Sequence, residues 1–236
     1  MEKFLENPRH IEIQVLSDNF QNAVYLGERD CSMQRRNQKV LEEAPAFGIP
    51  RKLIDRLGNR CVEACRRIGY RGAGTFEFLY ENGEFYFIEM NTRVQVEHPV
   101  TEEITGVDII KEQLLIASGQ PMSCAGLAPL SPKCHAIEFR INAEDPSLGF
   151  VPFPGIVERL NVPTGPGIRF DPGVAQGGAI PGQFDSMIAK LIVSAPSRSA
   201  GLTRARHALD ELAIAGVPTV RKFDQAVLEQ PAFVAT

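Results

Sequence analysis

Two apolar segments that each carry one glutamate constrain the fold of this chain more than any other feature. Residues 75–80 and 85–91 are rich in aromatic side chains, and the turn-forming pair Asn82 and Gly83 lies between them. This pattern predicts a β-hairpin. Glu77 and Glu89 fall inside the two strands, where a carboxylate is costly to bury unless another group neutralises it.

Together with the amide of Asn91, these two carboxylates offer hard oxygen ligands and predict a Mg²⁺ site shared with substrate phosphates. The prediction depends on the hairpin register. A two-residue turn would place Glu77 and Glu89 on opposite faces, whereas a three-residue loop over residues 81–83 places them on one face as diagonal neighbours. We therefore expect the longer loop, with Phe87 on the metal face as well. The alternative is two exposed glutamates on an edge strand.

The first half of the chain contains several further elements. Strict alternation predicts a strand over residues 10–16, and turn residues lead into a second strand over 23–27. Residues 29–46 show little periodicity and predict an ordered loop. Helical spacing predicts a helix over 50–68 and two short helices over 99–118, broken near Gly106.

The segment 120–133 is rich in proline, alanine, serine and glycine and is the predicted domain boundary. Beyond it, strands are predicted at 135–142, 155–160, 167–170 and 186–194, and helices at about 199–215 and 220–228. Strands followed by helices predict an α+β fold. We therefore expect two domains, over residues 1–119 and 133–236.

Composition narrows the class of protein. The formal net charge of −4 argues against nucleic acid or an anionic membrane as a partner. The sequence shows no apolar run of membrane-spanning length and opens with polar residues, so we expect no membrane span and no signal peptide. Five cysteines without CxxC spacing predict free thiols and a reducing, cytoplasmic compartment.

Residues 93–97 follow the hairpin and continue its odd-numbered phase if the chain stays extended. The guanidinium of Arg93 suits a planar oxyanion such as bicarbonate, and Glu97 could act as a general base. The alternative is a structural Arg93–Glu97 ion pair with His98 packed below it. Both interpretations stay open on these residues alone.

Two further basic features are more typical of a protein surface than of a binding site. Residues 34–39 form a short basic stretch that is typical of a solvated surface, and Arg140 faces Glu138 on a predicted strand, as in a surface ion pair.

Two motifs are absent from the sequence. The glycines at 69–74 have neither the Walker spacing nor the GxGxxG spacing of nucleotide-binding loops, and the chain has no Ala-Met-Lys-Met biotin-attachment sequence.

Four segments of the sequence resemble the biotin carboxylase family. They are Glu2–His10, Arg29–Lys39, Ile88–Pro99 and Phe139–Asp145. The resemblance covers essentially the whole chain, and residues 182–190 also resemble the α subunit of a bacterial acyl-CoA carboxylase. It implies the C-terminal part of an ATP-grasp domain, an antiparallel sheet with helices, followed by a smaller α+β biotin carboxylase C-terminal domain. We therefore expect the chain to be the C-terminal half of a longer protein.

The resemblance also implies roles for individual residues. The implied ATP contacts are Glu2, Lys3, Leu5, His10, Asn37, Glu77, Leu79 and Glu89. The implied metal ligands are Glu77, Glu89 and Asn91. The implied bicarbonate pocket is Lys39, Arg93, Gln95 and Val96. Glu97 resembles the general base, and Arg140 the cation that binds biotin and stabilises its enolate; Arg93 and Lys39 are also implied in catalysis. Asn37 departs from a histidine found in many bacterial members, so its contact with nucleotide is in doubt.

The implied reaction is the carboxylation of biotin by bicarbonate and ATP through carboxyphosphate, with Mg²⁺ or Mn²⁺. The implied partners are a biotin carboxyl carrier protein or domain, a carboxyltransferase subunit and a second copy of the chain. Because this sequence lacks a glycine-rich ATP lid, we expect negligible turnover from it alone. The alternatives are another ATP-grasp ligase, similar to carbamoyl phosphate synthetase, and a non-catalytic assembly module of a carboxylase.

Overall fold

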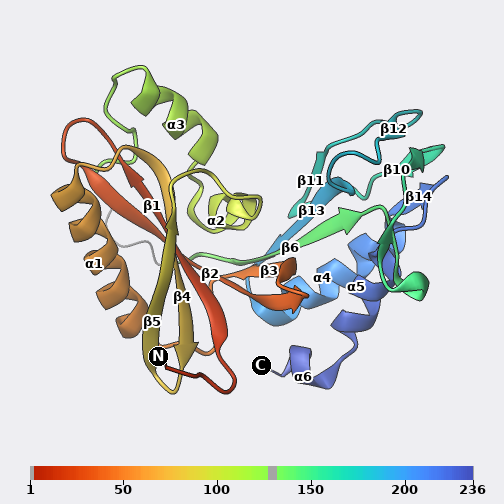
Figure 1. The fold of residues 1–236 in the computed structure, drawn as a ribbon, viewed down its shortest axis with the longest axis horizontal. Coiled ribbons are helices and arrows are strands. Elements are labelled where there is room, and N and C mark those ends of the chain that lie inside the picture. The colour runs from red at the N-terminus through yellow and green to blue at the C-terminus, as the bar shows by residue number, and fades with distance from the viewer. Residues whose placement is uncertain (1–2, 127–131, 236) are drawn as a thin grey trace. The chain divides into compact units, whose positions relative to one another are not determined.

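The computed structural model describes residues 3–126 and 132–235, and the chain divides into two compact units, Met1–His135 and Ala136–Thr236. Figure 1 shows both units as mixtures of strands and helices. No helix within the described ranges is long and apolar enough to cross a membrane.

The first unit is built on five antiparallel strands. In spatial order they are β3 (Gln38–Ala44), β2 (Ala23–Arg35), β1 (Arg9–Ser17), β4 (Gly72–Glu81) and β5 (Glu84–Asn91). Its helices are α1 (Arg51–Ile68), α2 (His98–Thr105) and α3 (Ile109–Ala117). The predicted helix over 50–68 and the break near Gly106 are confirmed.

The prediction of a loop over residues 29–46 is wrong, because this segment forms most of β2 and all of β3. Much of it is buried, including the charged side chains of Arg29, Glu42 and Glu43. Register shifts between the two strands also interrupt the two-residue alternation. A buried polar strand with bulges therefore lacks the alternating pattern by which a strand is recognised.

One face of this sheet is apolar and is covered by α1 (Figure 1). The odd-numbered residues of β1, Ile11, Ile13 and Val15, are buried there. A Cβ on Gly58 of α1 would lie 2.5 Å from the ring of Tyr25, so only glycine allows the helix to pack this close. His10, Glu12 and Gln14 of β1 lie on the other face, whereas Leu16 is buried in a second apolar cluster with Ile109 and Ile116 of α3.

The β4–β5 hairpin differs from the predicted geometry and still brings the two glutamates together. Its turn has two residues, Asn82 and Gly83, with φ of 51° and 84°, as a type I′ turn requires. A β-bulge between the Glu77 and Phe78 pairs then inserts one extra residue into β5. The bulge restores the parity that the short turn removes, and Glu77 is paired directly with Glu89.

The prediction that Phe87 lies on the metal face is wrong. Phe87 is paired with Phe78, and its ring centroid lies 5.7 Å from that of Phe78 and 6.2 Å from that of Phe76. Both partners belong to the apolar core under α1. The bulge follows Phe87 in the chain, so the face changes between Phe87 and Glu89.

The second unit contains a sheet in the order β11 (Ile168–Pro172), β13 (Met187–Ala195) and β6 (His135–Asn142). Three two-stranded ladders join β7 (Glu144–Asp145) to β8 (Val151–Pro152), β9 (Gly155–Ile156) to β12 (Ala179–Ile180), and β10 (Arg159–Asn161) to β14 (Ala213–Ala215). The helices are the 3₁₀ turn η1 (Pro146–Leu148), α4 (Arg198–Glu211), α5 (Arg221–Leu228) and α6 (Pro231–Val234).

Sequence patterns located most of these elements. The predicted strand over 155–160 is two short strands, β9 and β10, and the predicted helix over 199–215 ends at Glu211 because the chain turns into β14. Ser197 caps α4 by accepting a hydrogen bond from the backbone N–H of Ala200. The apolar stripe that predicted this helix is buried.

Candidate active site

The polar face of the first unit carries a connected group of charged and amide side chains, here called the central cluster. Its members come from all five strands and from the segment that follows them. They are His10 and Glu12 on β1, Arg29 on β2, Lys39 on β3, Glu77 on β4, Glu89 and Asn91 on β5, and then Gln95 and Glu97. Neighbouring strands of an antiparallel sheet place opposed residues on one face, so residues from five strands that are separate in the sequence converge here.

The predicted metal ligands meet at one point of this cluster. Nδ2 of Asn91 lies 2.8 Å from Oε1 of Glu77 and 3.3 Å from Oε1 of Glu89. The two carboxylates therefore face the same small volume rather than diverging. Two carboxylates and an amide that can present its oxygen after a half-turn of the side chain form a donor set that fits Mg²⁺ or Mn²⁺.

Lys39 connects the acidic groups on the other side of the cluster. Its Nζ donates to Oε1 of Glu97 at 2.7 Å, also donates to Glu12, and lies 3.5 Å from Oε1 of Glu77. Burial alone would lower the pKa of Lys39, but its charge interactions with Glu12 and Glu97 outweigh burial and raise the pKa above its usual range. Lys39 is therefore a permanent cation between three carboxylates.

His10 adds a second cation. Its Nε2 lies 2.8 Å from Oε2 of Glu77 and 3.4 Å from Oε1 of Glu12. Burial alone would lower the pKa of His10, but its close contacts with both carboxylates raise it to about 9. The pKa values of Glu12 and Glu77 are lowered despite burial, by Arg29 and His10 for Glu12 and chiefly by His10 for Glu77. The cluster therefore holds charged acids and charged bases together near neutral pH.

The chain after β5 does not stay extended, so the condition under which residues 93–97 would continue the metal face is not met. It bends at once, and Glu97 becomes the N-cap residue of α2. The bend brings Nε2 of Gln95 within 2.7 Å of Oε1 of Glu77 and leaves Glu97 paired with Lys39. The guanidinium of Arg93 is instead exposed and donates to the carbonyl of Val94 at 3.2 Å, so the prediction that Arg93 continues the metal face is wrong.

The other predicted residues of the first unit are exposed or half-buried. Lys3 is exposed and sits 4.3 Å from the ring centroid of Tyr86. Asn37 is exposed in the β2–β3 turn with a φ of 65°. Leu5, Leu79 and Val96 are half-buried, and Leu79 is paired with His10 across β1 and β4.

The last two predicted residues do not belong to the described part of the first unit. Arg140 belongs to the second unit, on β6, and is half-buried. Glu2 lies outside the described residues.

The sequence analysis missed Glu12 and Arg29, which form the buried centre of the cluster. They are direct cross-strand partners on β1 and β2, and both side chains are 0 % exposed. Nη2 of Arg29 lies 2.9 Å from Oε2 of Glu12. The sequence did offer one signal, the carboxylate of Glu12 inside the alternating β1 pattern. Interpreting it would have required recognising residues 29–35 as a strand, because that strand supplies the opposite charge of Arg29.

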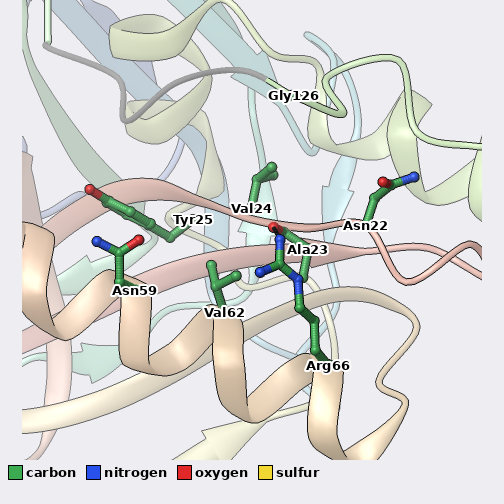
Figure 2. Close-up of a pocket in the computed structure, with 8 residues that line it drawn as sticks. All are labelled: Asn22, Ala23, Val24, Tyr25, Asn59, Val62, Arg66 and Gly126. Carbon is green, nitrogen blue, oxygen red and sulfur yellow. Dashed lines mark hydrogen bonds between the residues drawn. The ribbon is translucent and has the colours of Figure 1, made fainter.

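A separate cavity of about 290 Å³ lies on the α1 side of the sheet. Figure 2 shows Asn59, Val62 and Arg66 entering it from α1 and residues 22–25 from the start of β2, with Gly126 completing the lining. None of these described lining residues carries a carboxylate, so they offer neither acidic metal ligands nor a general base. The chemistry of the chain is therefore assigned to the central cluster rather than to this cavity.

Comparison with known proteins gives matches over both units. Residues 1–125 match the model of the carbamoyl-phosphate synthase L chain, ATP binding domain, and residues 138–236 match that of the biotin carboxylase C-terminal domain. The chain is 58% identical to biotin carboxylase from Haemophilus influenzae, over 99% of this chain and 52% of the relative. It is 46% identical to biotin carboxylase 1 from Bacillus subtilis, over 100% of this chain and 52% of the relative.

Solved structures give the same result. The biotin carboxylase domain of a thermophilic 2-oxoglutarate carboxylase, solved with bicarbonate, matches with a TM-score of 0.96 and 46% identity, over 99% of this chain and 53% of that one. A dimer of this domain from Hydrogenobacter thermophilus, solved with MgADP, ADP and bicarbonate, matches with a TM-score of 0.95 and 46% identity, over 99% and 52% of the two chains. The predicted α+β fold, an antiparallel sheet with helices, is confirmed. The chain spans about half the length of the relatives it matches.

Proposed function

The chain belongs to the biotin carboxylase family, and on that premise we propose that it supplies the metal, bicarbonate and biotin residues of an ATP-dependent biotin carboxylase. The proposed reaction is the first half-reaction of an acyl-CoA or acetyl-CoA carboxylase, in which bicarbonate carboxylates biotin through carboxyphosphate. One observation carries the proposal. Glu77, Gln95, Lys39 and Glu97 form one connected network, so a proposed metal ligand, two proposed anion-binding groups and the proposed base are adjacent.

Glu77, Glu89 and Asn91 are the proposed ligands of Mg²⁺ or Mn²⁺. When bound, the ion supplies positive charge that screens the ATP phosphates. The converging carboxylates described above support this role, because oxygen donors at one point are what such an ion requires. His10, Leu79, Lys3, Leu5, Asn37 and Glu2 are the proposed contacts to the rest of the nucleotide.

Lys39, Arg93, Gln95 and Val96 are the proposed bicarbonate pocket. Lys39 and the amide of Gln95 donate hydrogen bonds inside the cluster already, and Arg93 would have to turn inward from its exposed position. Glu97 accepts the proton of bicarbonate, so that a bicarbonate oxygen can attack the γ-phosphate and release ADP. Lys39 stabilises this proton transfer, because its charged Nζ lies next to Glu97 and belongs to the proposed bicarbonate pocket.

Carboxyphosphate then gives CO₂ and phosphate, and the phosphate removes the proton from N1 of biotin. Arg140 is proposed to bind biotin and to stabilise the negative charge that develops on its ureido oxygen. The nucleophilic N1 then bonds to the carbon of CO₂. The proposed domains are an ATP-grasp part over 1–119 and a biotin carboxylase C-terminal domain over 133–236, in keeping with the two family matches.

The proposed partners follow from the same reaction. Biotin is presented by a carrier protein or domain, and a carboxyltransferase subunit uses the product. A homodimer is proposed by analogy with the Hydrogenobacter thermophilus domain, which is described as a dimer. A cytoplasmic location is proposed because all five cysteines are free and four are buried.

Two alternatives are weaker. Another ATP-grasp ligase would share the ATP-binding domain match, but the second match and the relatives' names favour biotin carboxylase. A non-catalytic assembly module would have no need for two carboxylates, one of them buried, that converge on one amide.

Metal binding separates the enzyme proposal from the assembly module. We expect Mn²⁺ binding, measured by calorimetry or electron paramagnetic resonance, to be lost in Glu89→Gln. Glu84→Gln is the matched control, because Glu84 is an exposed glutamate on the same strand. Equal Mn²⁺ affinity in the two variants would contradict the proposed metal site.

A further inference from the structure

Arg29 occupies the centre of the central cluster without reaching its solvent-facing side. Its side chain is 0 % exposed and is the largest of the fully buried side chains in the part of the chain that the structure describes. A buried charge is costly unless hydrogen-bonding partners surround it. Its nearest charged partner is Glu12, on the neighbouring strand β1, to which both Nε and Nη2 donate at 3.1 and 2.9 Å.

The remaining donors of Arg29 reach β1 again, α2, β4 and the segment that follows β5. Nη1 donates to Oε1 of Gln14 on β1 at 2.7 Å and to Oγ1 of Thr101 on α2 at 3.0 Å. Nη2 donates to Oε1 of Gln95 at 2.7 Å and to Oγ1 of Thr75 on β4 at 3.2 Å. All three guanidinium nitrogens are engaged, in the planar fork geometry that only arginine provides.

The contact with Gln95 has a directional consequence. Because the amide oxygen of Gln95 accepts from Arg29, its NH₂ group faces the other way and donates to Oε1 of Glu77 at 2.7 Å. If the amide turned over, its oxygen would face the carboxylate and its NH₂ would face the guanidinium. Both contacts would then be repulsive, so Arg29 selects the orientation of the amide.

The contacts with Glu12 and Thr101 lead to the proposed base. Glu12 accepts from Lys39, and Lys39 donates to Glu97. Thr101 belongs to α2, whose N-cap residue is Glu97. Arg29 is therefore linked to Glu97 by two routes. Its shortest link to Glu77 passes through Gln95, and longer links pass through Glu12 and then His10 or Lys39.

We propose that Arg29 is a positioning residue, which fixes the amide of Gln95 and, through it, the metal-binding carboxylate of Glu77. The inference rests on the proposed function, in which Glu77 binds the divalent ion and Gln95 faces bicarbonate. Arg29 touches neither the ion nor the reacting atoms in this arrangement. Residues that orient metal ligands in this way change metal affinity by about 10- to 100-fold when they are substituted.

The test uses Mn²⁺ affinity of the whole chain in the variants Arg29→Lys, Gln95→Leu and the double variant. Lysine keeps the charge and loses the fork, so we expect Arg29→Lys to weaken Mn²⁺ binding by about tenfold or more. Gln95→Leu should give a similar loss, and the double variant little more than either single one, because in the proposed role Arg29 acts on Glu77 through Gln95. Unchanged affinity in Arg29→Lys, or losses that multiply in the double variant, would overturn the inference.

Arg198 provides the structural control. It is a second buried arginine, in the other unit, and donates to the carbonyls of Phe233 and Val234. Arg198→Lys should lower the melting temperature and leave Mn²⁺ affinity unchanged. A loss of Mn²⁺ affinity in this variant as large as in Arg29→Lys would mean that any loosened buried arginine has the same effect, and would also overturn the inference.

A measurement on the metal-free wild type can separate the positioning role of Arg29 from the proposed metal site, because it needs neither bound metal nor a folded variant. In the metal-free wild type, the side-chain N–H signals of Gln95 should be well resolved and slow to exchange with solvent, because both ends of the amide are held. Signals like those of a free glutamine would refute the positioning role even if Arg29→Lys fails to fold. A wild type that binds no Mn²⁺ but shows held amide signals would sink the proposed metal site and leave the role of Arg29 in orienting Gln95 intact.

Discussion

Glu77 and Glu89 stand directly opposite each other in the β4–β5 ladder, and Nδ2 of Asn91 lies 2.8 and 3.3 Å from their carboxylate oxygens. This relationship depends on an irregularity rather than on a regular hairpin. The two-residue turn at residues 82–83 alone would pair Glu77 with Ile88, and the β-bulge moves the pairing by one residue. The bulge is therefore the local feature that completes the proposed metal face.

Deleting Ile88 gives a sharp test of the bulge. Without this residue the ladder can run regularly from the turn, and Glu89 moves into the position opposite Glu77 while Phe87 stays opposite Phe78. We expect the deletion variant to keep Mn²⁺ binding close to that of the wild type. A loss as complete as in Glu89→Gln would contradict this account of the register.

Deleting Met90 is the matched control on the same strand. Glu89 keeps its place opposite Glu77, but Asn91 moves into the position opposite Phe76 and so onto the apolar face. We expect Mn²⁺ affinity to fall by about tenfold or more when a ligand of this kind is removed. Equal affinity in the two deletion variants would show that Asn91 is not a ligand.

The sequence predicted the acidic hairpin and most helices because their signals are local. Glu77 and Glu89 are conspicuous in aromatic strands, and the helix at 50–68 has a clear apolar stripe. The register was predicted wrongly, because a bulge leaves no mark on the alternation of a strand only eight residues long. The prediction that both glutamates share one face was nevertheless correct, because the turn and the bulge each shift the parity and the shifts cancel.

The centre of the cluster could not be predicted from local pattern. Arg29 and Glu12 are separated in the chain, and each one alone resembles a surface residue on a polar strand. Only the pairing of β1 with β2 shows that they neutralise each other inside the protein. The exposed position of Arg93 was equally hidden, because it depends on a bend after Asn91 that the sequence pattern does not indicate.

Turnover by the chain alone should be negligible. The sequence has no glycine-rich segment able to surround a triphosphate, and the chain spans about half the length of its relatives. We expect its bicarbonate-dependent ATPase rate to be far below that of a full-length relative measured in parallel, even where Mn²⁺ binds. A comparable rate in the isolated chain would refute the expectation that residues outside this chain are needed.

Asp18 gives a prediction for stability in acid. Its carboxylate accepts hydrogen bonds from the backbone N–H groups of Phe20, Asn22 and Met122, the last at 3.1 Å and far away in the sequence. Burial alone would raise the pKa of Asp18, but these bonds and the side chain of Asn22 lower it below its ordinary value of 3.8. A lowered folded-state pKa gives stability that is present above the unfolded-state value and is lost as the pH falls through the folded-state pKa.

We therefore expect Asp18→Asn to lower the free energy of unfolding near neutral pH by about 1–3 kcal/mol. The difference between variant and wild type should shrink when both are denatured in urea below about pH 4, since the wild-type carboxyl is then increasingly protonated. Asp108→Asn is a useful comparison, because Asp108 accepts one backbone hydrogen bond as the N-cap residue of α3. A difference for Asp18→Asn that is independent of pH would contradict the assigned role.

Gly58 sets how closely α1 approaches the sheet that carries the cluster. Helix propensity alone favours alanine over glycine by about 1 kcal/mol, so a Gly58→Ala variant would be more stable if the site were open. Here the added Cβ would lie 2.5 Å from the ring of Tyr25, and the clash involves a side chain held in place by its hydroxyl bond to Asp55 at 3.0 Å. We expect overpacking to outweigh propensity and to lower the free energy of unfolding by about 1–3 kcal/mol.

Urea denaturation measures this free energy, with Arg60→Ala on the exposed side of the same helix as a control whose stability should change little. A stabilised Gly58→Ala variant would mean that α1 can move away from β2 at little cost. The close approach of the helix to the sheet would then not require glycine at this position.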